Sequence, residues 1–372
     1  MPPDRPAIAV TGAHGFIGRN LVARLRELGH APAEVVRETP QREAEEAIGG
    51  ADIVFHLAGA NRPDHPADFQ RDNEEQARRL ARLVVAGDRK PLVVFSSSTK
   101  ALERSAYGES KRMAEAILLG LDDDRAARVE IYRLPNVFGK WSKPFYNSAV
   151  ATFCHCLARG EPIRIDDPDR PIDLLYIDDL IDQWLALMAG GSAAGRPQRP
   201  EGVHSTTVGE VAACLSSFAA GRDKGEVRPV GDGLDRALYA TFVSFLPEQE
   251  FARPLQAHRD ERGQFVEMLK TASCGQISCL TAHPGVTRGG HYHHSKVEKF
   301  LVVEGEARFR YRHILTGQSY EIRTAAERPM LVETIPGWAH EITNVGAGPM
   351  VCLVWANEIF DPDRPDTIAA PL

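Results

Sequence analysis

The order of apolar and polar residues changes character along the chain. Up to about Ala189, short apolar runs such as ADIVFHLAG and LVVFSSS alternate with segments whose apolar residues recur at helical spacing. This alternation predicts a doubly wound parallel β-sheet covered by helices. After Leu246–Leu255, short β-rich segments separated by Gly and Pro predict an antiparallel β-barrel. We therefore expect an α/β domain over residues 1–246, which includes a surface loop at Gly190–Gly202, and an all-β domain over residues 247–372.

Composition and charge narrow the class of partner. The 372-residue chain has a net charge of −7, with basic residues interspersed among acidic ones. We therefore expect no nucleic acid or membrane partner. No apolar run approaches membrane-spanning length. The six cysteines are scattered without a CxxC framework, and the first residues lack the apolar core of a signal peptide. Both features favour the reducing cytoplasm.

A glycine-rich turn follows the first apolar run. In TGAHGFIGRN, Gly12, Gly15 and Gly18 lie between a short strand and an amphipathic helix. Without Cβ atoms, such a turn lets a pyrophosphate approach the N–H groups at the positive end of the helix. The next strand ends in Arg37, where an arginine accommodates the 2′-phosphate of NADPH and an acidic residue would favour NAD. A solvated charge at the strand end is the alternative for Arg37.

The segment AYGESK predicts a proton-transfer pair. Tyr107 and Lys111 are four residues apart on an expected helix, so they share one face. A phenol is a poor acid near neutral pH, but an adjacent ammonium stabilises the phenolate and lowers the phenol pKa toward the working range. A hydroxyl at the end of LVVFSSST, from Ser98 or Thr99, would complete the set.

These motifs, TGxxGxxG, HLAG, Ser and YxxxK in that order, strongly resemble the extended short-chain dehydrogenase/reductase family over residues 5 to about 245. The resemblance implies that Ser98 holds the substrate oxygen and Tyr107 donates the proton. Lys111 would bind the nicotinamide ribose, and Asn73 would complete the tetrad. The implied coenzyme contacts are Gly12, Gly15, Phe16, Ile17, Gly18, Arg37, Leu57, Ala58, Tyr107, Lys111 and Pro135. The implied substrate contacts are Asn136, Asn147 and Arg170, with a plain surface arginine as the alternative for Arg170.

A second chemistry lies in the segment GVTRGGHYHHSKVEKFLVVEG. Because side chains alternate faces along a strand, His291 and His293 point the same way. Glu298 can return a carboxylate to the same pocket from the next strand, and His340 offers a fourth ligand after the turn IPGWAH. Three imidazoles and one carboxylate suit Zn²⁺ or a neighbouring divalent ion. The alternative is a pair of satisfied surface histidines beside an ordinary strand.

The spacing G-x5-HxH-x4-E-x6-G resembles the first motif of the cupin family. The second cupin motif is matched by Pro336, Gly337, His340 and Asn344, with one residue missing between the proline and the glycine. The resemblance implies that residues 247–372 form a metal-binding cupin β-barrel.

Along its whole length the chain resembles the CapF family of bifunctional capsular polysaccharide enzymes, through segments such as RLPNVFGKW, HYHHSKVEKFLVVEG and WANEIFDPDRPDT. That family acts on a UDP-linked 2-acetamido-2,6-dideoxy-4-hexulose on the way to UDP-N-acetyl-L-fucosamine. The resemblance implies that the cupin inverts C3 beside the C4 ketone. The reductase would then reduce C4 with NADPH, giving UDP-2-acetamido-2,6-dideoxy-L-talose. We also expect a homodimer.

Two other functions fit the same motifs. One is a sugar-nucleotide reductase with a non-catalytic, dimerising cupin. The other is a reductase fused to a ketoisomerase in which His291 and His293 act as bases without a metal. A sugar-nucleotide sensor is disfavoured because the motif residues are intact. Lys299, Tyr292 and His294 are candidates of equal rank for the acid or base at C3.

Overall fold

The computed structural model describes residues 5–60, 68–191, 197–250, 256–293, 296–314, 316–335, 337–363 and 365–372. By its internal contacts the chain divides into two units, Met1–Leu215 with Ala237–Leu246, and Ser216–Arg236 with Pro247–Leu372. A β-bridge between Glu226 and Lys270 ties the segment 216–236 to the second unit. Residues 192–196 of the predicted loop and 251–255 of the predicted linker lie outside the described residues.

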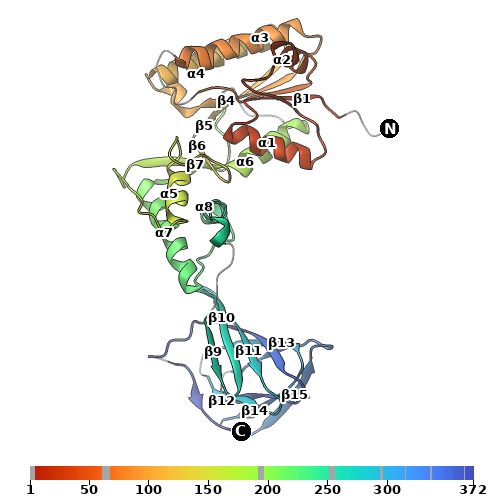
Figure 1. Ribbon diagram of the computed structural model, residues 1–372, viewed down its shortest axis with the longest axis vertical. Helices are drawn as coiled ribbons and strands as arrows, with labels where there is room; N and C mark the ends of the chain where they lie inside the picture. The colour runs from red at the N-terminus through yellow and green to blue at the C-terminus, as the bar shows by residue number, and fades with distance from the viewer. Residues whose placement is uncertain are drawn as a thin grey trace. The chain divides into compact units, whose positions relative to one another are not determined.

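A five-stranded parallel sheet forms the centre of the first unit (Figure 1). Its order is β2-β1-β3-β4-β5, with β1 (Ile8–Thr11), β2 (Ala33–Val35), β3 (Ile53–His56), β4 (Leu92–Ser98) and β5 (Arg128–Leu134). Every residue of β1 and β3 is buried, as parallel strands covered on both faces require. The strand order reverses beside β1, which is where such sheets bind ligands, beyond the carboxyl ends of the strands.

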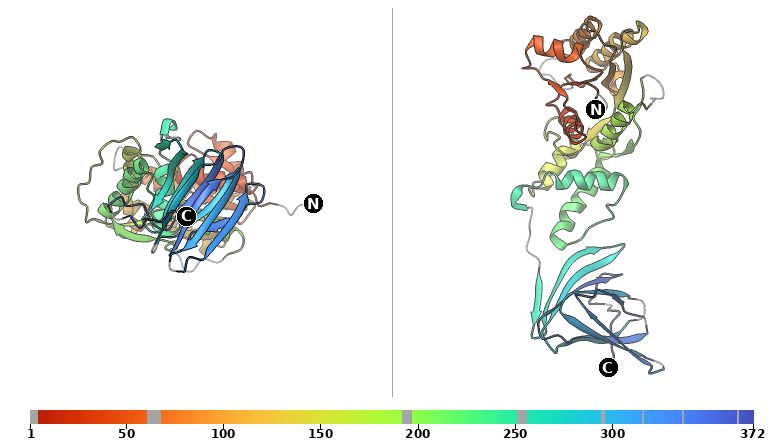
Figure 2. Two further views of the ribbon diagram at one scale, coloured as in Figure 1. Left: turned by 90° about the horizontal axis from the view of Figure 1, so that it is seen from below. Right: turned by 90° about the vertical axis from the view of Figure 1, so that its right-hand side faces the viewer.

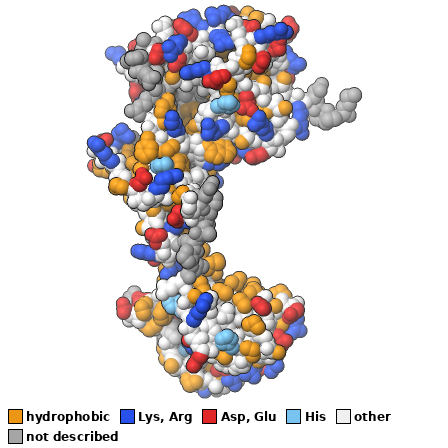
Figure 3. Space-filling model, in the orientation of Figure 1, with side chains coloured by type: hydrophobic (Ala, Val, Ile, Leu, Met, Phe, Trp, Pro, Cys, Tyr) orange, Lys and Arg blue, Asp and Glu red, His pale blue; other side chains and the backbone are white. Residues whose placement is uncertain are grey.

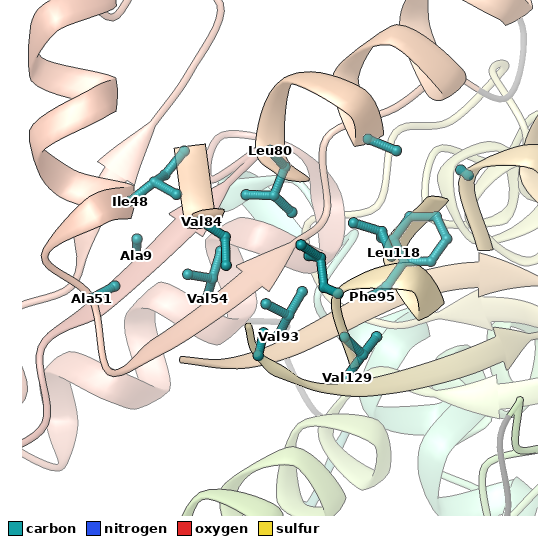
Figure 4. Packing of buried hydrophobic residues seen from close by; sticks show 14 of the residues in the cluster. Ala9, Ile48, Ala51, Val54, Leu80, Val84, Val93, Phe95, Leu118 and Val129 are labelled. Carbon is teal, nitrogen blue, oxygen red and sulfur yellow. The ribbon is translucent and has the colours of Figure 1, made fainter. Parts of the chain in front are cut away.

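Helices cover both faces of this sheet. α2 (Gln41–Gly49), α3 (Gln76–Ala86) and α4 (Ala106–Asp123) lie on one face, and α1 (Phe16–Glu27) and α6 (Ile177–Met188) lie on the other (Figure 1). Leu80 and Val84 of α3 pack toward Val54 and Val93 of the sheet in one buried cluster (Figure 4). Burial of each such side chain stabilises the fold by about 1.5–3 kcal/mol. The predicted doubly wound sheet is confirmed.

Beyond β5 the chain forms a small sheet and three more helices. The strands are β6 (Asn136–Phe138), β7 (Pro171–Tyr176) and β8 (His204–Thr207), and the helices are α5 (Ala149–Leu157), α7 (Val208–Lys224) and α8 (Gly233–Val243). β6 and β7 run parallel, whereas β7 and β8 run antiparallel. Short 3-10 turns occur at Thr99–Leu102 and Glu248–Glu250, and Gln70–Glu75 is a π-helical turn that leads into α3.

Two antiparallel sheets form the β-rich part of the second unit (Figure 2). The six-stranded sheet, in spatial order, contains β16 (Leu331–Glu333), β13 (Glu298–Glu304), β18 (Met350–Ala356), β11 (Gly275–Ala282), β10 (Gly263–Thr271) and β9 (Ala257–Asp260). The five-stranded sheet contains β15 (Ser319–Ala325), β14 (Glu306–His313), β17 (Trp338–Asn344), β12 (Thr287–Tyr292) and β19 (Ile368–Ala369). Phe300 of one sheet and Phe309 of the other meet in a shared core. The predicted β-rich C-terminal domain is confirmed.

Charged side chains of both signs lie on the surface of the first unit (Figure 3), and most of the cysteines are buried. Acidic and basic side chains are interspersed over the visible face of the first unit (Figure 3). The six cysteines are free thiols, and four of them are buried. None of the helices in the described ranges is long and apolar enough to cross a bilayer.

Candidate functional site

The turn between β1 and α1 is shaped by positions that leave no room for a side chain. Gly12 has a φ of +69°, and a Cβ on it would lie 2.7 Å from the Ala58 nitrogen. A Cβ on Gly18 would collide with the Gly12 carbonyl oxygen. Gly15 caps α1 and donates its N–H to that same oxygen at 2.9 Å. Phe16 and Ile17 begin α1, whose first turn carries no acidic side chain, so its N-terminus can accept an anionic group.

A cavity of about 520 Å³ opens beside this turn. Its walls come from the ends of β1 and β2, the segment after β3, and helices α2 and α3. Three predicted coenzyme residues, Gly12, Arg37 and Ala58, line it. Leu57 immediately precedes Ala58 and donates its N–H to the Thr11 carbonyl, while Pro135 follows β5. The cavity lies where dinucleotides bind in doubly wound sheets.

Tyr107 lies in the first turn of α4, close to the end of β4. A hydrogen bond links its side chain to Ser98, the last residue of β4, and its ring packs 5.4 Å from that of Phe69. Burial raises the pKa of the Tyr107 phenol, and the bond to Ser98 opposes part of that rise. The phenol therefore keeps its proton at neutral pH, which suits a proton donor. Thr99 begins the next 3-10 turn instead.

Lys111 follows one turn later on α4 and is buried. Its Nζ donates a hydrogen bond to the Ser96 carbonyl at 3.1 Å and lies 5.0 Å from the centre of the Phe95 ring. Burial lowers the pKa of Lys111 to about 8, although Glu115 works in the opposite direction. The prediction that this ammonium lowers the pKa of Tyr107 is wrong for the structure, because burial dominates at Tyr107 and the ammonium is held by Ser96.

Asn73 lies inside the π-helical turn that precedes α3. Its Nδ2 donates to the Ala60 carbonyl at 2.9 Å and to the Ser110 hydroxyl at 3.1 Å. Its buried Oδ1 has no hydrogen-bond partner among the described residues. A Cβ on Gly59 would lie 2.5 Å from that oxygen and 3.3 Å from the Lys111 Nζ. Asn73 and Lys111 thus both lie close to Gly59. The π-helical turn that carries Asn73 is of a kind that is frequent at functional sites.

His56 is a site residue that the sequence reasoning missed. It ends β3, lines the cavity, and hydrogen bonds through Nδ1 to the Thr11 hydroxyl at 2.8 Å. Its ring stacks on Phe95 with centroids 5.5 Å apart. Burial, with a smaller contribution from Lys111, lowers the pKa of His56 to about 3, so the ring is neutral. The sequence signal for this residue is the histidine that begins the HLAG motif.

The three predicted substrate residues are exposed and lie on separate segments. Asn136 begins β6, and its side chain donates to the Asp173 carbonyl at 3.2 Å. Asn147 stands just before the residue that caps α5, and Arg170 just before β7. None of the three is among the described residues that line the cavity beside Gly12.

The four predicted metal ligands do come together in the second unit. Ligand atoms of His291, His293, Glu298 and His340 all lie within 4.8 Å of one another. Nε2 of His293 is 3.4 Å from Oε2 of Glu298, and Nε2 of His340 is 3.7 Å from the same oxygen. His293 and His340 are buried, and His291 and Glu298 are partly buried. The alternative of two surface histidines beside an ordinary strand does not describe this arrangement.

A β-bulge aligns the first ligand with the last. The register between β12 and β17 shifts between Gly289 and His291, so that His291 pairs with His340. Gly289 and Gly290 both have positive φ, at +100° and +78°, which is the conformation that a bulge with an extra residue demands. The two glycines therefore direct the His291 side chain toward the cluster.

The protonation states of the cluster suit a bound cation. Burial, together with His340 and His293, lowers the pKa of His291 to about 4. Burial alone would raise the pKa of Glu298, but its contacts with His293, His340 and Lys296 hold that pKa well below its usual range. Nε2 of His340 is buried without a hydrogen-bond partner among the described residues. A neutral His291 imidazole, an ionised Glu298 carboxylate and a buried His340 nitrogen without a hydrogen-bond partner fit a divalent metal.

The structure also places residues around the cluster that the sequence did not single out. Nζ of Lys296 lies 3.1 Å from Oε1 of Glu298. The main-chain carbonyl of Asp366 accepts a hydrogen bond from Nδ1 of His293, and its carboxylate accepts one from the Lys296 N–H at 2.8 Å. Such contacts fix the tautomer and orientation of a ligating histidine. The irregular segment that contains Asp366 carries no periodicity that would have revealed them.

The three candidates for the acid or base at C3 differ in their position relative to the cluster. Lys299 pairs with Glu333 and lies over the Trp355 ring, on the opposite side of β13 from Glu298. Tyr292 lies on β12 directly after His291. His294 lies outside the described residues, as does Pro336 of the second cupin-like motif.

Two family models match the chain. Residues 8–199 match the NAD dependent epimerase/dehydratase family, and residues 258–368 match the polysaccharide biosynthesis C-terminal domain. The first match covers the five-stranded parallel sheet and its helices. The second covers nearly all of the two antiparallel sheets.

Full-length relatives share both parts in the same order. The chain is 50% identical over 365 residues to the UDP-2-acetamido-2,6-beta-L-arabino-hexul-4-ose reductase of Pseudomonas aeruginosa, a match that covers 97% of this chain and 98% of that protein. It is 37% identical to the crystal structure of the capsular polysaccharide assembling protein CapF from Staphylococcus aureus, with a TM-score of 0.92 over 98% of this chain and 100% of that one. A structure of CapF with the inhibitor 3-isopropenyl-tropolone superposes with a TM-score of 0.87 at 34% identity, over 98% and 99% of the two chains.

Proposed function

The chain belongs to the CapF family of polysaccharide biosynthesis enzymes, and from this premise we propose that it converts a UDP-linked 2-acetamido-2,6-dideoxy-4-hexulose in two steps. The second unit inverts C3, and the first unit reduces the C4 ketone to give UDP-2-acetamido-2,6-dideoxy-L-talose. The observation that carries the proposal is the 50% identity to a UDP-hexulose reductase over 98% of that relative's length. We place the domain boundary between residues 246 and 247.

In the reduction, the Tyr107 phenol donates its proton to the C4 oxygen while the Ser98 hydroxyl holds that oxygen. Burial supports this role, because it raises the pKa of Tyr107 and keeps the phenol protonated. NADPH supplies the hydride when bound. Lys111 and Asn73, which meet beside Gly59, would hold the nicotinamide ribose and replace the lost proton. Arg37 and Ala58 would contact the adenosine end of the coenzyme in the cavity.

At C3, His291, His293, Glu298 and His340 would hold Zn²⁺ or another divalent ion. These residues would hold the metal, which when bound would supply Lewis-acid stabilisation of the negative charge that develops as the C3 proton leaves. The buried Nε2 of His340, which has no hydrogen-bond partner among the described residues, supports a bound cation. The competing proposal, that His291 and His293 are themselves the bases, needs no metal for proton exchange. Asn136, Asn147 and Arg170 are proposed to bind the sugar nucleotide.

The outer face of the six-stranded sheet supports the expected homodimer. Leu301 lies directly opposite Leu331 on one side and Leu353 on the other. Leu331 is 64% exposed and Leu353 is 39% exposed, whereas the alternate residues Phe300 and Val302 face the core. An exposed apolar row across three adjacent strands is typical of an association surface. Leu331→Glu should shift the sedimentation coefficient from that of a dimer to that of a monomer.

NMR of the products formed from the 4-keto sugar nucleotide in deuterated solvent tests the two steps. With NADPH, we expect the reduced talose product with deuterium at C3. Without NADPH, we expect deuterium at C3 and no reduction. Reduction that retains the original C3 configuration would favour a dimerising, non-catalytic second unit. Exchange at the wild-type rate after metal removal, measured with metal analysis on the same sample, would favour the histidines as bases.

A further inference from the structure

Two arginines line the cavity beside Gly12 from different elements. The expected strand ends earlier than predicted, at Val35, so Arg37 lies in the turn two residues after β2, whereas Arg79 lies on α3. Gln76, Arg79, Leu80 and Leu83 recur at helical spacing and line the same cavity. Arg79 thus lines the cavity from α3, whereas Arg37 lines it from the turn after β2.

The charge on these walls is unbalanced. The described lining contains three arginines, Arg37, Arg71 and Arg79, against one acidic side chain, Asp72. Asp72 is already engaged, since its Oδ1 accepts from Nε of Arg71 at 2.9 Å. Arg71 also pairs with Asp68 at 2.8 Å. Subtracting one acid from three bases leaves two positive charges in excess.

Arg37 and Arg79 carry that excess. Within the described part of the chain, neither has an ion pair or a hydrogen-bond partner. The neighbouring Arg78 is different, because it pairs with Glu74 at 2.8 Å across one turn of helix. Two unpaired cations that face one cavity repel each other unless an anion lies between them.

The apolar residues that line the rest of the cavity suit a nucleoside base beside the anion. Ala44 and Ile48 of α2 and Leu80 of α3 are buried apolar residues of the lining, which suits the flat face of an adenine. A phosphate beside a nucleoside therefore fits the cavity, with the apolar walls holding the base and the guanidiniums holding the phosphate. Guanidinium groups recognise phosphate oxygens with paired N–H donors.

We propose that Arg79 is a specificity-determining residue that contacts the adenosine 2′-phosphate of NADPH from α3, in addition to Arg37. The inference rests on the proposed use of NADPH by the first unit and adds to it a second contact on a different element. Discrimination between NADPH and NADH would then depend on both the turn after β2 and α3. Changing Arg37 alone would leave part of the preference for NADPH.

Calorimetric titration of the full-length protein with 2′,5′-ADP and with 5′-AMP tests the proposal, because the two probes differ at the 2′-phosphate. Arg79→Ala should weaken 2′,5′-ADP binding by about 10- to 100-fold, the loss expected for a charge-assisted contact, and 5′-AMP binding by less than about 3-fold. Arg79→Lys should recover part of the lost affinity, since it keeps the charge but not the paired donors. Arg78→Ala is the matched control and should change neither affinity.

The outcomes separate this inference from the proposed reductase. Wild-type protein that binds neither probe would contradict nucleotide binding by the first unit, and with it the proposed function. Wild-type protein that prefers 2′,5′-ADP while Arg79→Ala binds it equally well would overturn only the role of Arg79. Equal losses for both probes in Arg79→Ala, with an unchanged melting temperature, would place Arg79 on the adenosine instead and also overturn the inference.

Discussion

His291 lies directly opposite His340 across the β12–β17 pair, and their ring centroids are 4.7 Å apart. The pairing exists because the bulge at Gly289 and Gly290 adds a residue to β12. Side chains alternate along a strand, so a one-residue slip without the bulge would turn His291 to the other face of the sheet. A main-chain irregularity thus decides whether the cluster has a third imidazole.

Gly289→Ala should disturb the cluster without touching any ligand. A Cβ at this position would lie 2.9 Å from both the Glu341 Cα and the His340 carbonyl oxygen, and the φ of +100° disfavours a side chain. We expect a loss of about 1–3 kcal/mol in the free energy of unfolding from the strained backbone, and a lower metal content per chain. Denaturant unfolding and elemental analysis measure the two effects.

Gly285→Ala is the control for this variant. Gly285 also has a positive φ, +76°, but a Cβ there would have no described atom within 4 Å. It should lose stability through backbone strain while it keeps its metal. Equal metal contents in the two variants would show that the bulge does not position His291.

Asp366→Ala should weaken metal binding from outside the ligand set. The Asp366 carboxylate anchors the Lys296 N–H at 2.8 Å, and its own carbonyl accepts from His293. Loss of the anchor should loosen the His293 ring and raise the metal dissociation constant by about 10- to 100-fold. Competition with a chelator of known affinity measures this constant. Asp363→Ala, in the same irregular segment, should leave it unchanged.

Tyr107→Phe should abolish reduction while sparing the fold, because only a hydroxyl is removed. Loss of the proton donor should slow NADPH oxidation by about 10²- to 10⁴-fold, with NADPH affinity and deuterium exchange at C3 retained. Tyr132→Phe removes another buried phenol, on β5, and should oxidise NADPH at the wild-type rate. NADPH oxidation by Tyr107→Phe at an undiminished rate would reject Tyr107 as the donor.

Reduction should decline on the alkaline side as Lys111 loses its proton. Burial lowers the pKa of Lys111 to about 8, so the ammonium that we propose holds the ribose is neutralised above that pH. A plot of kcat/KM for reduction against pH should therefore fall with an apparent pKa near 8. Lys111→Arg, which keeps its charge, should remove this alkaline fall even if its maximum is lower.

The same shift has a consequence for stability. The pKa of Lys111 is lower in the folded chain, at about 8, than its ordinary value of 10.5. Between these values the unfolded chain binds more protons, so this residue makes unfolding less favourable as pH rises through that window. Below about pH 8 the buried charge destabilises the fold by a constant amount. Lys111→Met should flatten the dependence of unfolding free energy on pH between about 8 and 10.5, relative to wild type.

The sequence predicted the layers of the fold because they follow from local patterns. Alternating strand and helix periods specify a parallel sheet, and short strands between glycines and prolines specify antiparallel ones. It did not predict that residues 216–236 join the second unit, since that assignment depends on a bridge between Glu226 and Lys270. The register of such distant pairs leaves no mark in a local window.

In the candidate sites, too, local sequence patterns predicted contacts between residues that are close in sequence but not between distant ones. His291 and His293 could be found because side chains two residues apart along an extended chain face the same way, and Glu298 because it begins the next strand only five residues after His293. Asp366 could not, because it meets His293 across 73 positions and through a main-chain carbonyl that any residue type possesses. The predicted effect of the Lys111 ammonium on the pKa of Tyr107 fails for a related reason. Helical spacing puts it on the face of Tyr107, but the ammonium donates to the main-chain carbonyl of Ser96.

The residues of the cavity beside Gly12 are synthesised long before those of the ligand cluster. Every described residue that lines the cavity beside Gly12 falls between Thr11 and Leu83, whereas the ligand cluster begins at His291 and its partner Asp366 comes later still. Domains generally fold in the order in which they are translated. We therefore expect a nascent chain whose residue 246 has left the exit tunnel to bind a nucleotide, whereas the ligand cluster would be complete only once Asp366 had left it.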